Sequence, residues 1–203
     1  MYKNSMKRRF VFWAGVLLLV LSGCATPGQK FIDINYHRSH DPSETEPNKG
    51  RKVGIAKLED LRSGTGEGYV GYRILNDNSR ETYLVNGLDL GTSLQKAFIS
   101  YYDKNGFEAA PMDAWEFSPE GVKNAAKDFD LIIAGSINKF ECQARKKGFV
   151  TEMTLDIDIT LYSGNAGENT RKKIPLALIV ERTEVNFSLQ KFEHFVNLAV
   201  EDM

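Results

Sequence analysis

Apolar and polar residues alternate strictly in the second half of the chain. Over 149–161 every second residue is apolar or threonine, and those between, from 152 to 160, are polar or acidic. This period of two predicts a long antiparallel strand with one covered face and one face in water. After a turn at 163–167, a second long strand is expected over 172–185. Pro175 predicts an edge position or a bulge there, because proline has no N–H to donate.

Helical spacing of apolar residues occurs in three other segments. One helix is expected over about 88–105, with a left-handed stop at Asn105-Gly106. A second begins at Ser118-Pro119-Glu120, where a hydroxyl cap precedes a proline in the first turn. A third, amphipathic helix closes the chain and carries its apolar residues within 189–199.

Three shorter apolar runs, at 53–58, 107–112 and 131–144, predict further strands, the last with a bulge at its glycine. Together with the two long strands they predict an α+β fold. We expect a mixed sheet of about five strands with three helices packed mainly on one face. Cys142 shares one parity with Phe140 and Ala144, which favours a small buried hydrophobe over a reactive nucleophile.

The start of the chain has the layout of a secretory signal, with basic residues before an apolar run at 10–21. Such a run covers about 18 Å as a helix, short of the ~30 Å hydrocarbon core, so a membrane span is the weaker alternative. Leu21-Ser22-Gly23-Cys24 resembles the lipobox of bacterial lipoproteins. In those proteins the cysteine is linked to diacylglycerol, becomes the new N-terminus and is usually N-acylated, so Cys24 is the expected lipidation site.

These features divide the chain into a signal peptide at 1–23, a lipid-anchored tether at 24–50 and a single α+β domain at 51–203. The tether is proline-bearing, and an apolar island at 31–36 could form a short strand docked on the domain. Two or three acyl chains would anchor it stably to a membrane. In enterobacterial lipoproteins an Asp after the lipidated Cys usually means inner-membrane retention. Ala25 therefore implies the outer membrane, facing the periplasm, for a Gram-negative source.

The net charge bears on nucleic-acid binding, and the cysteine content bears on disulfide formation. Removing the signal takes away four of the 26 basic residues and leaves 22 against 27 acidic residues, a net charge of −5. This mixed surface gives no electrostatic footprint for nucleic acid. Once Cys24 is acylated, only Cys142 remains as a thiol, so no intramolecular disulfide is expected.

Three motifs suggest chemistry that their surroundings do not support. The Gly-rich stretch at 66–71 matches G-x-G-x-x-G, but no helix start follows it to bind a pyrophosphate, so a surface loop or hairpin is expected and nucleotide binding is not. Asp156 and Asp158 project from one face, which is simply polar. His37 and His40 are only weak evidence for a metal site, because no further ligands lie at suitable spacing. We therefore expect no catalytic, cofactor or metal residues.

The order of the elements resembles the YajG-like family of outer-membrane lipoproteins. The resemblance rests on the lipobox, Asp60-Leu61-Arg62, the run from Gly87 through Asn105-Gly106-Phe107, and Asp130-Leu131-Ile132-Ile133, followed by two alternating strands and a terminal helix. It implies a small, non-enzymatic α+β envelope lipoprotein without an assigned biochemical role.

The leading hypothesis is a tethered, non-enzymatic interaction or accessory module that docks an envelope protein. Either an exposed sheet edge or the Gly-rich loop could be the docking surface. The candidate contacts are Asp60, Arg62, Tyr69 and Tyr72, since arginine and aromatic side chains on loops suit interfaces, although Asp60 and Arg62 could simply pair with each other. A carrier of lipids or small molecules with an apolar pocket is the alternative, and an envelope hydrolase comes third.

Overall fold

The computed structural model describes residues 28–37, 48–87, 89–165, 167 and 170–203. The signal peptide, Cys24 and His40 lie outside the described residues, and so do the predictions made for them. Within the described ranges, none of the helices is both long and apolar enough to cross a bilayer.

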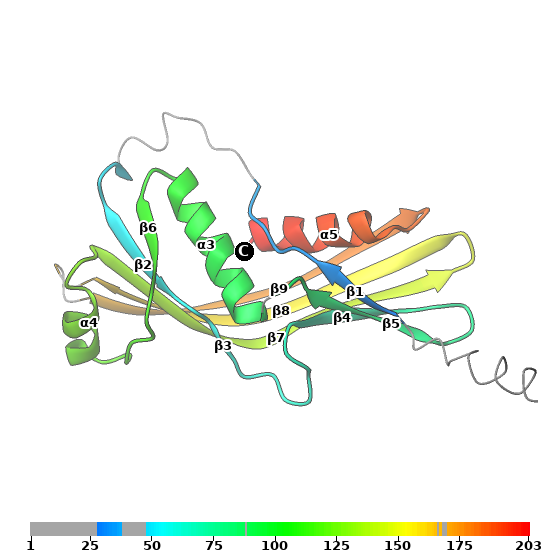
Figure 1. The fold of residues 1–203 in the computed structure, drawn as a ribbon, viewed down its shortest axis with the longest axis horizontal. Coiled ribbons are helices and arrows are strands. Elements are labelled where there is room, and N and C mark those ends of the chain that lie inside the picture. Colours follow the sequence, from blue (N-terminus) through cyan, green and yellow to red (C-terminus); the bar gives the residue numbers. More distant parts are fainter. Residues whose placement is uncertain (1–27, 38–47, 88, 166, 168–169) are drawn as a thin grey trace, which may run out of the picture.

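Three long antiparallel strands run side by side through the sheet and end at one of its edges (Figure 1). β7 (Leu131–Lys147) pairs along its length with β8 (Val150–Asn165), and β8 pairs with β9 (Thr170–Val185). The alternation predicted for β8 is confirmed from Thr151 to Ile159, where the odd-numbered residues are buried. Phe149 is the exception: it lies at the hairpin tip and is 96% exposed. Pro175 lies in β9, which pairs only with β8 among the described strands, so its predicted edge position is confirmed.

Three strands pair in parallel with the other edge of β7, one after another along its length. β2 (Lys52–Ala56) pairs with its beginning, β3 (Glu59–Asp60) with its middle and β4 (Tyr69–Ile74) with its end. β6 (Glu108–Met112) flanks β2, whereas β5 (Arg80–Val85) and then β1 (Gln29–Ile32) extend the sheet beyond β4. The sheet therefore has nine strands rather than the five expected, and it divides into two branches.

A bulge in β7 sets which side chains face the helices. The register shifts between Ile137 and Lys139, three residues after the glycine where the bulge was expected. Before the shift the odd-numbered Ile133 and Ile137 are buried, and after it the even-numbered Phe140 and Cys142 are. The extra residue turns the strand so that both halves keep apolar side chains toward the core.

Two of the three described helices, α3 and α5, lie on one face of the sheet, in line with the expectation of packing mainly on one face, and the third lies on the other. α3 (Leu90–Lys104) and α5 (Leu189–Glu201) pack on the same side of the long strands (Figure 1). Ile133 packs with the α3 side chains, whereas its neighbour Ile132 packs with Val122 of α4 (Pro119–Ala125). Because successive residues of a strand point to opposite faces, α4 covers the other face of this branch.

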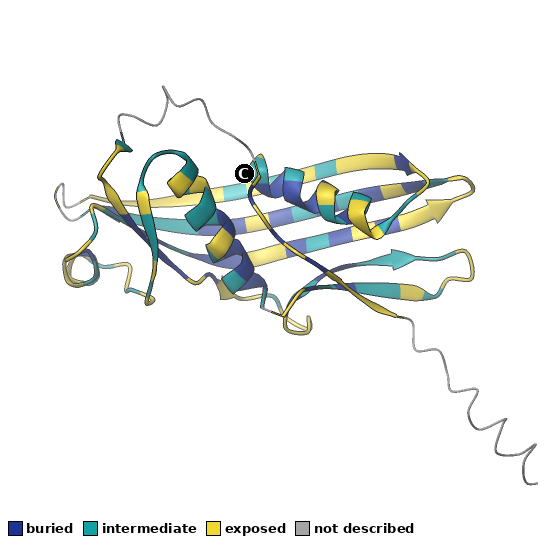
Figure 2. Cartoon of the chain, turned by 45° about the horizontal axis from the view of Figure 1, so that its top comes forward, coloured by how far each residue is buried: buried dark blue, intermediate teal, exposed yellow. Residues whose placement is uncertain are grey.

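The main core fills the space between α3, α5 and the sheet. The buried residues of both helices are turned toward the strands (Figure 2). Tyr83 of β5 stacks on Phe192 of α5 with ring centroids 4.0 Å apart. Cys142 is fully buried in the same cluster, as predicted, and burial raises the pKa of its thiol.

The segment after β1 lies against the C-terminal helix. β1 begins at Gln29, two residues before the expected strand, and the chain beyond it stays extended with Ile34 and Tyr36 buried. Asn197 of α5 accepts a hydrogen bond from the N–H of Asn35, at 3.0 Å, and donates another to the carbonyl oxygen of Asp33, at 3.1 Å. The apolar island of the predicted tether is therefore fixed to the folded body.

Candidate functional site

The candidate site lies where the two branches of the sheet separate. β3 pairs with β7 at residues 136–137 and β4 pairs with it at 142–145, so no described strand pairs with the intervening edge of β7. The N–H of Leu61 donates to the carbonyl oxygen of Ile137 at 3.0 Å, and the chain then leaves the sheet in a Gly-rich loop that returns at Tyr69. The bulge at Asn138 lies directly beneath this loop.

Arg62 occupies the gap between the branches. Its Nη1 donates to the carbonyl oxygens of Phe140 and Tyr69, both at 2.8 Å, so the guanidinium supplies the donor that a paired strand would otherwise give to β7. Nε and Nη2 donate to the two carboxylate oxygens of Asp60 at 2.8 and 2.7 Å. The Arg62 side chain is only 5% exposed, and the hydrogen bonds from Arg62 hold the pKa of Asp60 below its usual range.

The glycines of the G-x-G-x-x-G stretch have structural roles. Gly68 has φ +74°, and its carbonyl accepts from the N–H of Val85, which fixes the return into the hairpin of β4 and β5. A Cβ on Gly71 would lie 1.9 Å from the carbonyl oxygen of Cys142, so only glycine lets β4 approach β7 this closely. The expectation of a loop or hairpin is confirmed.

Side chains from β7 and β8 form the polar wall beside the loop. The Tyr69 hydroxyl donates to Glu141 Oε1 at 3.3 Å, and burial together with the neighbouring Glu141 charge raises the pKa of the phenol. Lys139 forms an ion pair with Asp156, which raises the pKa of the ammonium group. Each charged group on this wall thus has an opposite charge or a hydroxyl next to it.

Together these elements enclose an open cleft of about 560 Å³. It is lined by the loop from Arg62 to Gly66, by Tyr69 and by residues 138–141 of β7. Ser63, Thr65 and two glycines of the loop line the cleft, beside Lys139 and Glu141. Such a surface offers hydrogen-bond donors and acceptors to a polar chain.

The structure unites two of the four candidate contacts in this cleft. Arg62 and Tyr69 line it, whereas Asp60 contacts the cleft only through Arg62. Tyr72 lies further along β4, where Arg80 stacks over its ring at 4.6 Å. Asn138, Lys139 and Glu141 complete the lining but were not predicted, because only the position of the bulge brings them beside the loop.

The paired aspartates on β8 project from one face, as expected, and both have partners. Asp156 pairs with Lys139, and Asp158 accepts from Asn138 Nδ2 at 3.0 Å. Across the part of the chain that is described, no three His, Cys, Asp or Glu side chains come together as metal ligands would. His37 is exposed.

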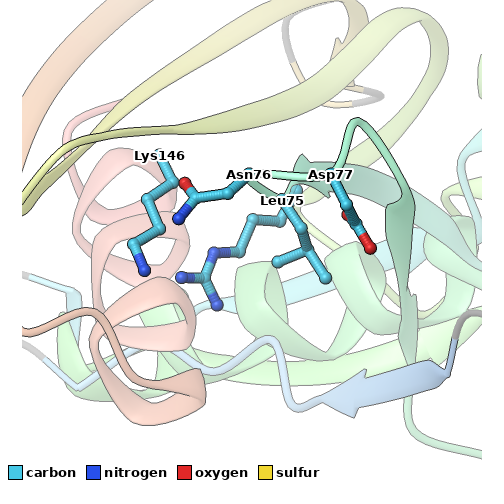
Figure 3. Close-up of a pocket in the computed structure, with 5 residues that line it drawn as sticks. Leu75, Asn76, Asp77 and Lys146 are labelled. Carbon is cyan, nitrogen blue, oxygen red and sulfur yellow. The ribbon is translucent and has the colours of Figure 1, made fainter.

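A second, smaller cleft of about 370 Å³ lies at the end of the β4–β5 hairpin. Leu75, Asn76, Asp77 and Lys146 surround it in Figure 3, and Arg73 also lines it. Nη1 of Arg73 lies 3.6 Å from Oε2 of Glu81, and the guanidinium stacks over the ring of Phe187. The positive charge of Arg73 therefore has partners within the fold.

Comparisons with known proteins return only distant likenesses. No protein-family model matches the chain, and a search of curated proteins finds no match. Among solved structures, an uncharacterised protein is 11% identical with a TM-score of 0.45, covering 84% of this chain and 93% of that one. A putative neuraminyllactose-binding hemagglutinin homolog from Helicobacter pylori is 7% identical with a TM-score of 0.40, covering 83% and 88%.

Lipoprotein GNA1162 from Neisseria meningitidis is 8% identical with a TM-score of 0.35, covering 75% of this chain and 96% of that one. All three TM-scores lie below 0.5, so these likenesses assign neither a family nor a function. The resemblance to the YajG-like family stays a prediction.

Proposed function

We propose that this protein is a lipid-anchored, non-enzymatic interaction module of the bacterial envelope, and that its cleft beside the Gly-rich loop binds an extended segment of a partner protein. The observation that carries the proposal is the cleft itself. It combines Arg62 and Tyr69, chosen from the sequence as contacts, with exposed loop backbone and a polar wall on β7.

The fixed floor of the cleft supports recognition of a polypeptide. Arg62 is held by four hydrogen bonds, so the loop backbone is ordered before a partner arrives and less entropy is lost on binding. Ser63, Thr65 and the glycine peptides offer both donors and acceptors, which an extended main chain requires. Lys139 and Glu141 flank them with opposite charges and favour a partner segment of mixed charge.

The anchor in this proposal is Cys24, acylated after removal of residues 1–23. The lipobox motif supports it, and Ala25 supports an outer-membrane location facing the periplasm. Because the folded body begins near Gln29, the spacer between lipid and fold is short, and the domain would lie close to the membrane surface.

Site-specific photocrosslinking in intact cells tests the cleft. A photoreactive residue at Thr65, on the loop, is expected to capture a defined envelope protein, whereas the same residue at Phe149, a fully exposed hairpin tip, is not. The Arg62→Ala variant should reduce capture from Thr65. Equal capture from both positions, or none from Thr65, would refute docking in the cleft.

Fractionation of a Cys24→Ser variant tests the anchor separately. The unmodified protein is expected in the membrane pellet after a salt wash, and the variant in the supernatant. A variant that still pellets would contradict lipid attachment at Cys24 without bearing on the cleft.

A further inference from the structure

The outer edge of β9 is a long, unpaired edge in the described part of the sheet. β9 has 16 residues and pairs with β8 from Thr170 to Val185, and no other described strand adjoins it. The other outer strands, β6 and β1, have five and four residues. A long free edge presents a row of N–H and C=O groups that can pair with another strand.

Apolar side chains follow this edge on both faces. On the helix side, Leu176, Leu178 and Val180 are half-buried against the main core, and Ile174 is 39% exposed. On the opposite face Ile179 is 67% exposed. β8 covers only one edge of β9. A strand paired with the other edge would remove these apolar side chains from water.

The charges on β9 are divided between its ends. Arg171, Lys172 and Lys173 lie near its beginning, and Glu181, Arg182 and Glu184 lie near its end, where Glu184 is paired with Arg182 and Lys191. In an antiparallel pair of copies, Lys173 of each copy can lie opposite Glu181 of the other, which gives one opposite-charge pair on each side of the two-fold axis. Parallel pairing would place like charges side by side.

We propose that β9 pairs with β9 of a second copy of this chain, antiparallel and about a two-fold axis at Ala177. Directly opposite residues in an antiparallel pair share a face, so the helix sides of both copies form one continuous surface. The register places the following residues opposite one another: Ile174 and Val180, Leu176 and Leu178, Pro175 and Ile179, and Lys173 and Glu181. Every apolar residue of β9 between 174 and 180 then meets an apolar residue.

Neighbouring registers are poorer. Moving the two-fold axis to Leu178 places Ile174 opposite Arg182, and moving it to Ile179 places Leu176 opposite the same arginine. The proposed register has two costs. Pro175 lacks an N–H and removes one donor from each copy. Lys172 faces Arg182, whose charge is already paired with Glu184 at 2.7 Å.

Lysine and proline are also residues that protect an edge from pairing. On β9 they are confined to residues 172–175, whereas residues 176–181 contain neither. In the proposed register Lys173 and Pro175 lie within the interface, opposite Glu181 and Ile179, whereas residues 176–178 at its centre contain neither lysine nor proline.

Sedimentation of the purified full chain in density-matched detergent tests the association. The unmodified protein is expected to have twice the protomer mass, and Ile179→Lys is expected to have the protomer mass, because it places an ammonium group against the apolar edge. Phe149→Lys makes the same kind of change at another exposed residue, away from the edge, and should remain dimeric. A monomeric unmodified protein, or an Ile179→Lys dimer, would overturn the proposal.

A thiol crosslink tests the register without depending on a weakened interface. Ala177→Cys lies on the two-fold axis, so a short bifunctional thiol reagent should join two copies. Thr183→Cys is a matched control, because its two thiols would be about 40 Å apart in the proposed register. The unmodified chain, with Cys24 and Cys142, gives the background. Crosslinking of Thr183→Cys as efficient as that of Ala177→Cys, or no crosslink at Ala177, would overturn the register.

Discussion

Replacing Arg62 with alanine should destabilise the fold more than any other single change in the loop. The substitution removes two hydrogen bonds to backbone carbonyl oxygens, of Tyr69 and Phe140, and leaves those oxygens in a largely buried gap. Hydrogen bonds from a charged donor contribute about 1.5–3 kcal/mol each. The pairing with Asp60 adds only about 1 kcal/mol, because that carboxylate is 31% exposed and remains solvated.

The expected loss in the free energy of unfolding is therefore about 4–7 kcal/mol. This is a large share of the roughly 5–15 kcal/mol typical of a domain. Arg62→Lys should recover only part of it, since one ammonium group cannot bind Asp60 through two nitrogens and also reach both carbonyls.

Urea unfolding followed by far-ultraviolet circular dichroism measures the effect. Arg80→Ala is the matched control: that exposed guanidinium lies 4.6 Å from the Tyr72 ring centre, and its loss should cost about 0.5–1 kcal/mol. If Arg62→Ala lowers the free energy of unfolding no more than Arg80→Ala does, Arg62 does not hold the two branches together.

Three further predictions follow from the same region and its neighbours. Gly71→Ala should cost at least about 1–3 kcal/mol in urea unfolding because its Cβ would overlap the Cys142 carbonyl, whereas Gly66→Ala, with open space around it, should be nearly neutral. The buried Cys142 thiol, with its raised pKa, should resist maleimide in the native protein and react once urea unfolds it. Because the folded-state pKa of Asp60 is lowered, its pairing stabilises the fold at neutral pH, and this contribution should disappear as the pH falls below about 4. In urea titrations at several pH values, Asp60→Asn should lose this acid-dependent part, and an unchanged pH profile would contradict the assignment.

The parts of the fold that follow a regular period could be predicted from the sequence. β8 alternates from Thr151 to Ile159, β9 follows it after a turn as its partner, and α3 and α5 bury a helical stripe, so local pattern located all four. A hairpin was one expectation for the Gly-rich stretch, but β4 and β5 were not counted among the five strands, because a glycine and a register shift interrupt β4 and leave too few alternating residues to show a period. The face covered by α4 depends on tertiary packing of Ile132, which no local pattern specifies.

The candidate site could be predicted in part for the same reason. Arg62 and Tyr69 are recognisable as arginine and aromatic residues flanking a Gly-rich loop. Their neighbours on β7 come from a strand 70 or more positions later, and the bulge that turns Lys139 and Glu141 toward the loop lies three residues from its expected position. A one-residue shift in a strand exchanges its two faces, so the polar wall could not be assigned without the register.

The contact between the segment after β1 and α5 has a consequence for how the chain folds. Asn35 and Asp33 bind Asn197 across separations of 162 and 164 residues, so this segment reaches its final neighbours only after the last helix is made. Closing so large a loop is entropically costly and slows folding. During synthesis the apolar side chains of this segment therefore stay exposed to water until α5 is complete. Chains shortened at the C-terminus should consequently be trapped as incomplete, protease-sensitive species.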